Sequence, residues 1–136
     1  MNRTLIACLG SAFVLTLSLA WRTEPLLAHH GRGASYDGSK LMTVQGTITE
    51  WAYRNPHAAL YVDVKEADGK VVNWGFESQN VSSLSRLRIF RNSFHAGQQV
   101  TIKFNPSRGG APVGVLRKMY DTSGKEILSF GGPIDE

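Results

Sequence analysis

Three histidines and one glutamate are the residues of this sequence whose chemistry best suits a metal ion. His29 and His30 are adjacent, His57 follows Asn55–Pro56, and Glu77 ends an apolar stretch. Imidazole is the commonest protein ligand for transition metals, and both copper and zinc accept it. C-x-x-C and H-E-x-x-H patterns are absent, so spacing alone identifies no metal motif. The alternative is that the paired histidines are solvated and that His57 hydrogen-bonds within its own turn.

The processing of the N-terminus decides how strong this site would be. A basic residue precedes an apolar run from Leu5 to Ala20, which is typical of a secretory signal peptide and too short for a permanent membrane span. Cleavage after Ala20 or after Ala28 fits the rule of small residues, and we expect the second. His29 would then offer its α-amine and its imidazole to one ion, and His57 a third nitrogen. This set favours copper, with zinc as the alternative.

Export constrains the rest of the chain. We expect a periplasmic or secreted protein with no transmembrane segment after processing. The single cysteine lies in the signal peptide, so no disulfide is expected. The formal net charge of +4 is too small to predict a nucleic-acid partner. Because the mature chain has no cysteine nucleophile, no G-x-S-x-G motif and no patterned carboxylate pair, we predict no catalytic residues and a non-enzymatic role.

A second group of residues could contact a planar or sugar-like ligand. Tyr61 alternates with Leu60 and Val62, so its ring is predicted to face away from the core. With it, the ligand-binding candidates are Trp51, Arg54, Asn55 and Tyr61. An exposed tyrosine on a strand, however, needs no functional explanation.

Another class of function is an accessory subunit of a larger periplasmic or membrane complex. Such a subunit would dock through exposed strand edges and through Tyr53 and Tyr61. Arg86, Arg88 and Arg91 form a basic run that could receive an anionic partner or a lipid headgroup, but a solvated helix end explains them equally well.

Alternating apolar and polar residues predict the elements that position these side chains. Patterns of period two, typical of half-buried strands, occur at 41–49, 60–65, 71–77, 100–104 and 113–120, and more weakly at 127–130. Between the third and fourth, one short helix is predicted, because apolar positions recur at helical spacing at Val81, Leu84 and Leu87 or Arg88. Asn80 or Ser78 can cap its start. Trp74 shares a face with Val72 and Phe76, which favours a core position.

This order predicts a mostly β protein: a five- to six-stranded Greek-key barrel like the oligonucleotide- and oligosaccharide-binding (OB) fold, with one short helix between strands 3 and 4. The expected organisation is a signal peptide at 1–28, a flexible N-terminal arm at 29–40 and an OB-like domain at 41–136.

Several of these motifs together resemble an uncharacterised family of small exported bacterial proteins. The resemblance covers nearly all of the mature chain and is carried by His29–His30, Tyr36–Asp37, Gly46–Trp51, Asn55–Pro56–His57, Trp74–Glu77 and Gly97–Val100. It implies export and a single barrel-like domain, and no activity, because the family is a domain of unknown function. The sequence departs from the pattern at Ala52–Arg54, which lengthens a spacer, and at Arg88–Phe90, where Gly-Trp is more usual.

Overall fold

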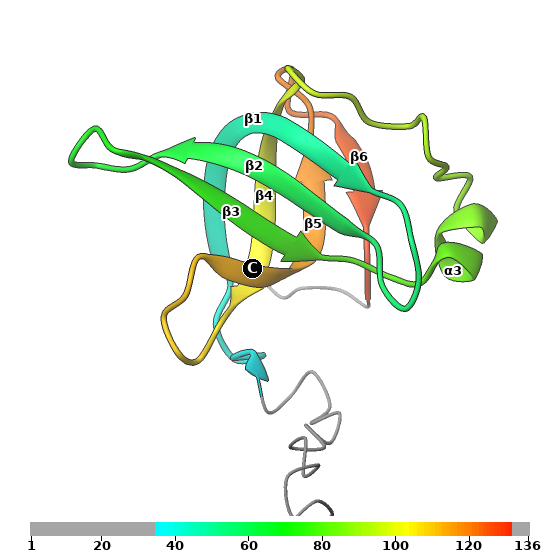
Figure 1. The fold of residues 1–136 in the computed structure, drawn as a ribbon, viewed down its shortest axis with the longest axis horizontal. Helices are drawn as coiled ribbons and strands as arrows, with labels where there is room; N and C mark the ends of the chain where they lie inside the picture. The colour runs from blue at the N-terminus through cyan, green and yellow to red at the C-terminus, as the bar shows by residue number, and fades with distance from the viewer. Residues whose placement is uncertain (1–34, 132–136) are drawn as a thin grey trace, which may run out of the picture. The chain divides into compact units, whose positions relative to one another are not determined.

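The computed structural model describes residues 35–131, which fold as a closed β-barrel with one short helix (Figure 1). The predicted signal peptide, both cleavage positions, His29 and His30 lie outside the described residues. The elements in chain order are β1 (Met42–Ala52), β2 (Ala59–Lys65), β3 (Val71–Glu77), α3 (Val81–Arg86), β4 (Gln99–Pro106), β5 (Val113–Tyr120) and β6 (Glu126–Ser129). No helix in this part of the chain is long and apolar enough to cross a membrane.

The barrel closes through one parallel pairing. The strand order is β3-β2-β1-β4-β5-β6, with antiparallel neighbours throughout, and β3 also pairs with β5 in parallel. Strands β1 to β5 therefore form a closed mixed barrel, and β6 extends the sheet beyond β5. The sequence prediction of an OB-like barrel with one helix between strands 3 and 4 is confirmed.

Strand β1 pairs with β2 along one edge and with β4 along the other, and Gly46 takes part in both pairings. Gly46 pairs with Val64 of β2 and with Val100 of β4. A Cβ atom there would overlap the Asp63 carbonyl oxygen and the Val62 side chain. Only glycine permits this close approach of two strands.

The barrel interior is filled by the inward-facing half of each strand pattern. Trp74 packs at the edge of this core, against Phe76 and Phe104 at centroid distances of 6.0 and 5.3 Å, as its face predicted. The largest fully buried side chains include Ile48, Leu60, Val62, Phe76, Ile102, Phe104, Leu116 and Met119. Burial of this apolar surface supplies the main driving force for folding.

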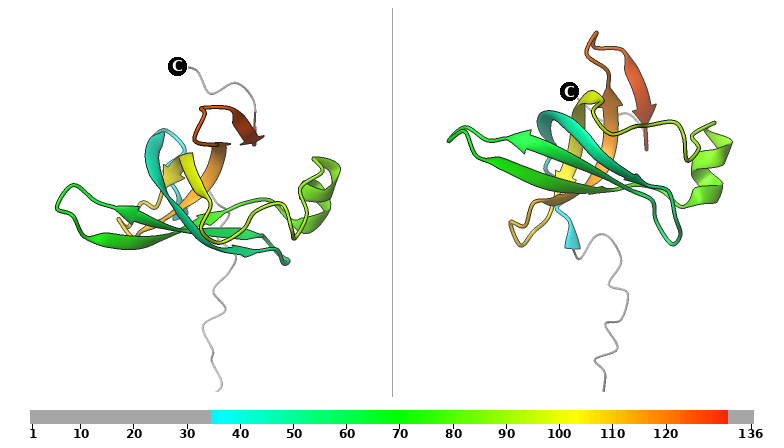
Figure 2. Two further views of the ribbon diagram at one scale, coloured as in Figure 1. Left: turned by 90° about the horizontal axis from the view of Figure 1, so that it is seen from above. Right: turned by 45° about the horizontal axis from the view of Figure 1, so that its top comes forward.

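Helix α3 lies at one end of the barrel, opposite the β2–β3 hairpin, as the two views of Figure 2 show. Its six residues are too few to be stable alone, so tertiary contacts must hold it. Of the two caps that the sequence allowed, Asn80 is the one used: its side chain accepts a hydrogen bond from the Ser83 N–H at 2.9 Å. Leu84 is fully buried. Leu87, expected on the buried helix face, is the C-cap and is 52% exposed.

The last part of the predicted arm, residues 35–40, contacts the barrel. Tyr36 forms an isolated bridge with Ser107, and the Asp37 N–H donates to the Pro106 carbonyl at 2.8 Å. These contacts place the chain that precedes β1 against the end of β4.

Candidate functional site

His57, Glu77 and Tyr36 meet on the outer surface of the barrel. The His57 Nδ1 lies 2.8 Å from Glu77 Oε1, and the Tyr36 hydroxyl donates to Glu77 Oε2 at 3.1 Å. The three side chains come from the β1–β2 connection, the end of β3 and the segment before β1. One carboxylate therefore joins three segments that are distant in sequence.

Backbone pairing at the start of β2 brings His57 beside Glu77. Ala59 is the register partner of Glu77. One residue earlier, Ala58 is fully buried, donates its N–H to the Gln79 carbonyl at 3.0 Å and accepts from the Ser78 N–H at 2.8 Å. His57 directly precedes this anchored residue and follows the cis peptide bond between Asn55 and Pro56.

The contact with Glu77 sets the role of each imidazole nitrogen. A carboxylate only accepts hydrogen bonds, so Nδ1 is the nitrogen that carries the donated proton. In the neutral ring this leaves a lone pair on Nε2, and no residue in the range 35–131 is recorded as its partner. The His57 side chain is 43% exposed and that of Glu77 24% exposed. A carboxylate behind a metal-binding histidine is the usual supporting arrangement in metal sites.

The described residues alone do not complete a metal site. Between residues 35 and 131, no group of three or more His, Cys, Asp or Glu side chains is placed to hold an ion. Two of the four predicted ligands, His57 and Glu77, are brought into direct contact. The other two, His29 and His30, lie outside the described residues.

Trp51 and Tyr53 serve the packing of the barrel end. The Trp51 Nε1–H donates to the Phe90 carbonyl at 3.0 Å, and its ring meets Phe94 edge-on at 5.3 Å. Tyr53 is only 9% exposed, and its hydroxyl lies 2.9 Å from Ser85 Oγ. The burial of Tyr53 removes it from the aromatic docking surface considered above.

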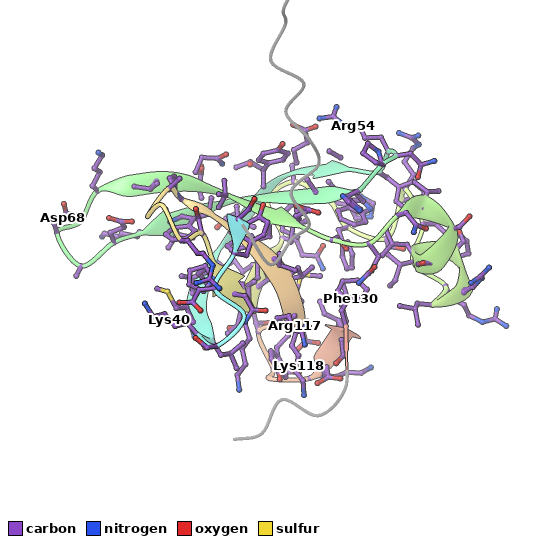
Figure 3. All side chains as sticks on the ribbon, turned by 90° about the horizontal axis from the view of Figure 1, so that it is seen from below. Lys40, Arg54, Asp68, Arg117, Lys118 and Phe130 are labelled. Carbon is purple, nitrogen blue, oxygen red and sulfur yellow. The ribbon has the colours of Figure 1, made fainter. Side chains whose placement is uncertain are left out.

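The remaining ligand-binding candidates lie on the outside, with Arg54 and Asn55 adjacent in the β1–β2 connection and Tyr61 on β2. Asn55 is exposed, and its Oδ1 accepts from the Val81 N–H at 3.2 Å, so it supports the start of α3. Arg54 is exposed at the end of the barrel near α3 (Figure 3). Tyr61 is half-buried and faces outward as predicted, with its ring against Gly75.

Sequence reasoning did not assign a role to Tyr36, although its motif carried part of the family resemblance. The neighbouring Asp37 has a pKa below its usual value, chiefly because the Ser39 hydroxyl donates to its carboxylate at 2.7 Å; Arg108 and Lys40 add favourable charge. These contacts fasten the chain next to Tyr36. No local sequence pattern could have paired Tyr36 with a carboxylate on β3, since their meeting depends on the barrel.

One hollow on the described surface shares no residue with this site. Its volume is about 560 Å³, and it is lined by residues of β1 and β4 and by the β5–β6 turn, including Gln45, Thr101 and Asp121. Asp121 is the one ionisable residue among those that line it. The contacts around His57 are therefore the stronger candidate for chemistry.

Comparison with known proteins gives one match. A family model described as a family of unknown function (DUF6152) covers residues 17–117. No curated protein and no solved structure matches the chain.

Proposed function

Because this chain belongs to DUF6152, a family of unknown function, we propose its role from the site alone: an exported, non-enzymatic binding module that holds a transition-metal ion, preferably copper, at His57. The observation that carries this proposal is the 2.8 Å contact between His57 Nδ1 and Glu77 Oε1. It orients the ring and leaves Nε2 as the metal-binding atom.

In this proposal Glu77 supports His57 and is not itself the first choice of ligand. Both of its carboxylate oxygens have partners, His57 at 2.8 Å and Tyr36 at 3.1 Å. A carboxylate so engaged fixes the orientation and the tautomer of the imidazole. Zinc would accept the same nitrogen.

The other nitrogens would come from the mature N-terminus. Cleavage after Ala28 would free the α-amine of His29 next to two imidazoles. The chain from His30 to Tyr36 spans at most about 20 Å when extended, and the Tyr36 hydroxyl is bonded to the same carboxylate as His57. Chain length therefore allows these nitrogens to reach His57.

Copper titration of the exported, naturally processed protein tests the proposal. We expect one Cu²⁺ bound with a Kd below about 10 μM. His57→Ala should weaken binding at least about tenfold, and Glu77→Gln by about 10- to 100-fold. His95→Ala is the matched control, since His95 is also exposed but lies in a different turn.

The N-terminal contribution is tested separately. A chain that begins at His29 should bind more tightly than the same chain with an acetylated α-amine, because acetylation removes one nitrogen ligand. Equal affinity of wild type and His57→Ala would refute the metal site. N-terminal sequencing that finds Trp21 first would exclude the α-amine of His29.

A further inference from the structure

Strand β6 has one edge that no other strand of the described chain covers. It pairs with β5 on one side only. The Phe130 N–H donates to the Arg117 carbonyl at 2.7 Å, and backbone groups in an antiparallel pair alternate between facing the partner and facing away. The N–H and C=O groups of Ser129, in the regular part of this pair, consequently point away from β5. An exposed strand edge of this kind is a template for another extended chain.

A groove runs along this edge. One hollow of about 220 Å³ is lined by Leu87 and Ile89 on one side and by β6 on the other. A second, of about 360 Å³, lies between Arg86 and the chain around Ser129. Leu87 and Ser129 line both hollows, so the two adjoin. In Figures 1 and 2, α3 and the chain that follows it lie on the same side of the barrel as β6.

The walls of the groove differ in chemistry along its length. Leu87, Ile89 and Ile127 make one part apolar, and Leu87 is the second most exposed of the large hydrophobic side chains described. At the other end the charges are positive: Arg86 lines the hollow, and the Arg117 guanidinium lies against Gly131 (Figure 3 shows Arg117 close to Phe130). The acidic residue of the apolar part, Glu126, is paired with Lys118 at 3.3 Å.

We propose that this groove receives an extended segment of a partner protein, which adds to β6 as a further strand. An apolar side chain of the segment packs against Leu87 and Ile89, and an acidic side chain lies beside Arg86. The backbone edge provides the hydrogen bonds, while the apolar and basic ends provide the selectivity.

The side of the groove formed by Leu87 and Ile89, opposite β6, favours a single extended segment over other binding partners. A second barrel pairing through its own β6 would have to fit between β6 and the end of α3, whereas a single extended chain needs only the width of one strand, about 5 Å. A lipid headgroup would meet the arginines but would not pair with the N–H and C=O groups of Ser129 as an extended chain does. The surface shares no residue with the His57 site and is independent of the proposed metal binding.

Selection from a random octapeptide library on the purified full chain tests this inference. We expect enriched peptides that combine alternating apolar residues with an acidic residue. Leu87→Asp should weaken the best peptide at least about tenfold, as expected for a central apolar contact. Arg86→Glu should shift the selection from acidic to basic peptides. Val71→Asp is the control, since Val71 is 57% exposed but lies at the β2–β3 hairpin, and it should leave affinity unchanged.

Backbone recognition is tested with the selected peptide itself. Two versions of the peptide are compared, each N-methylated at every second backbone amide but at opposite sets. Methylation of the set whose N–H groups face β6 should abolish binding, and methylation of the other set should leave binding unchanged. The absence of any enriched peptide, or equal affinity for wild type and Leu87→Asp, would overturn the inference. A dimer in light scattering that Leu87→Asp dissociates would also overturn it, in favour of a second copy as the occupant.

Discussion

Replacing Arg88 by glycine should stabilise the domain. Arg88 is the one non-glycine residue between 35 and 131 with a positive φ, at 58°. Two hydrogen bonds hold it there: the Arg88 N–H donates to the Ser85 carbonyl at 3.0 Å, and the Ile89 N–H donates to the Leu84 carbonyl at 2.9 Å. This is the Schellman arrangement, in which the residue after the C-cap adopts the left-handed conformation and is usually glycine.

The size of the effect follows from two opposing terms. The left-handed conformation costs a residue with a Cβ atom about 1–2 kcal/mol. Glycine loses more backbone entropy on folding, which costs roughly 0.5–1 kcal/mol. Arg88→Gly should therefore raise the free energy of unfolding by about 0.5–1 kcal/mol, which corresponds to about 2–8 °C in Tm for a domain of this size.

Urea unfolding followed by tryptophan fluorescence measures this change. Arg88→Ala keeps the strained backbone and removes only an exposed side chain, so it should change stability by less than about 0.5 kcal/mol. Arg86→Gly, inside the helix, should destabilise by about 1 kcal/mol. The reasoning is wrong if Arg88→Gly is no more stable than wild type, or if Arg88→Ala stabilises as much as the glycine variant.

Two further predictions concern single polar contacts. Tyr53→Phe removes a buried hydroxyl that lies 2.9 Å from Ser85 Oγ and donates to the Ile89 carbonyl at 3.1 Å. It should lower the free energy of unfolding by about 1–3 kcal/mol in the same urea assay. An unchanged unfolding midpoint would contradict a stabilising role for these hydrogen bonds. The pKa of Asp121 lies below the ordinary value of 3.8, first because the Ser123 hydroxyl donates to its carboxylate at 2.6 Å. The carboxylate therefore stabilises the folded state above pH 3.8, and this contribution is lost as the pH falls below that value. Asp121→Asn should reduce the loss of stability that the domain shows below pH 3.8, and a carboxyl NMR titration that finds the pKa of Asp121 at or above 3.8 would refute the assignment.

The local sequence pattern was sufficient to predict most of the fold. Alternation along β2 and β3 placed Leu60, Val62 and Phe76 inside and Tyr61 outside, because side chains on a strand point to opposite faces. Asn80 marked the start of α3 through its capping chemistry. Leu87 was misplaced, since a helix of six residues ends before the predicted apolar face is complete.

By itself, the sequence determined which elements form, which of their faces are buried and which side chains could bind a metal ion. Only the tertiary structure decided that His57 and Tyr36 share the Glu77 carboxylate, that Tyr53 is buried under α3, and that β6 leaves an edge beside Leu87. The physical reason is the range of the interactions involved. Strand and helix patterns arise from neighbours a few residues apart, whereas these contacts join segments that are distant in the chain and that meet only once the strands have paired.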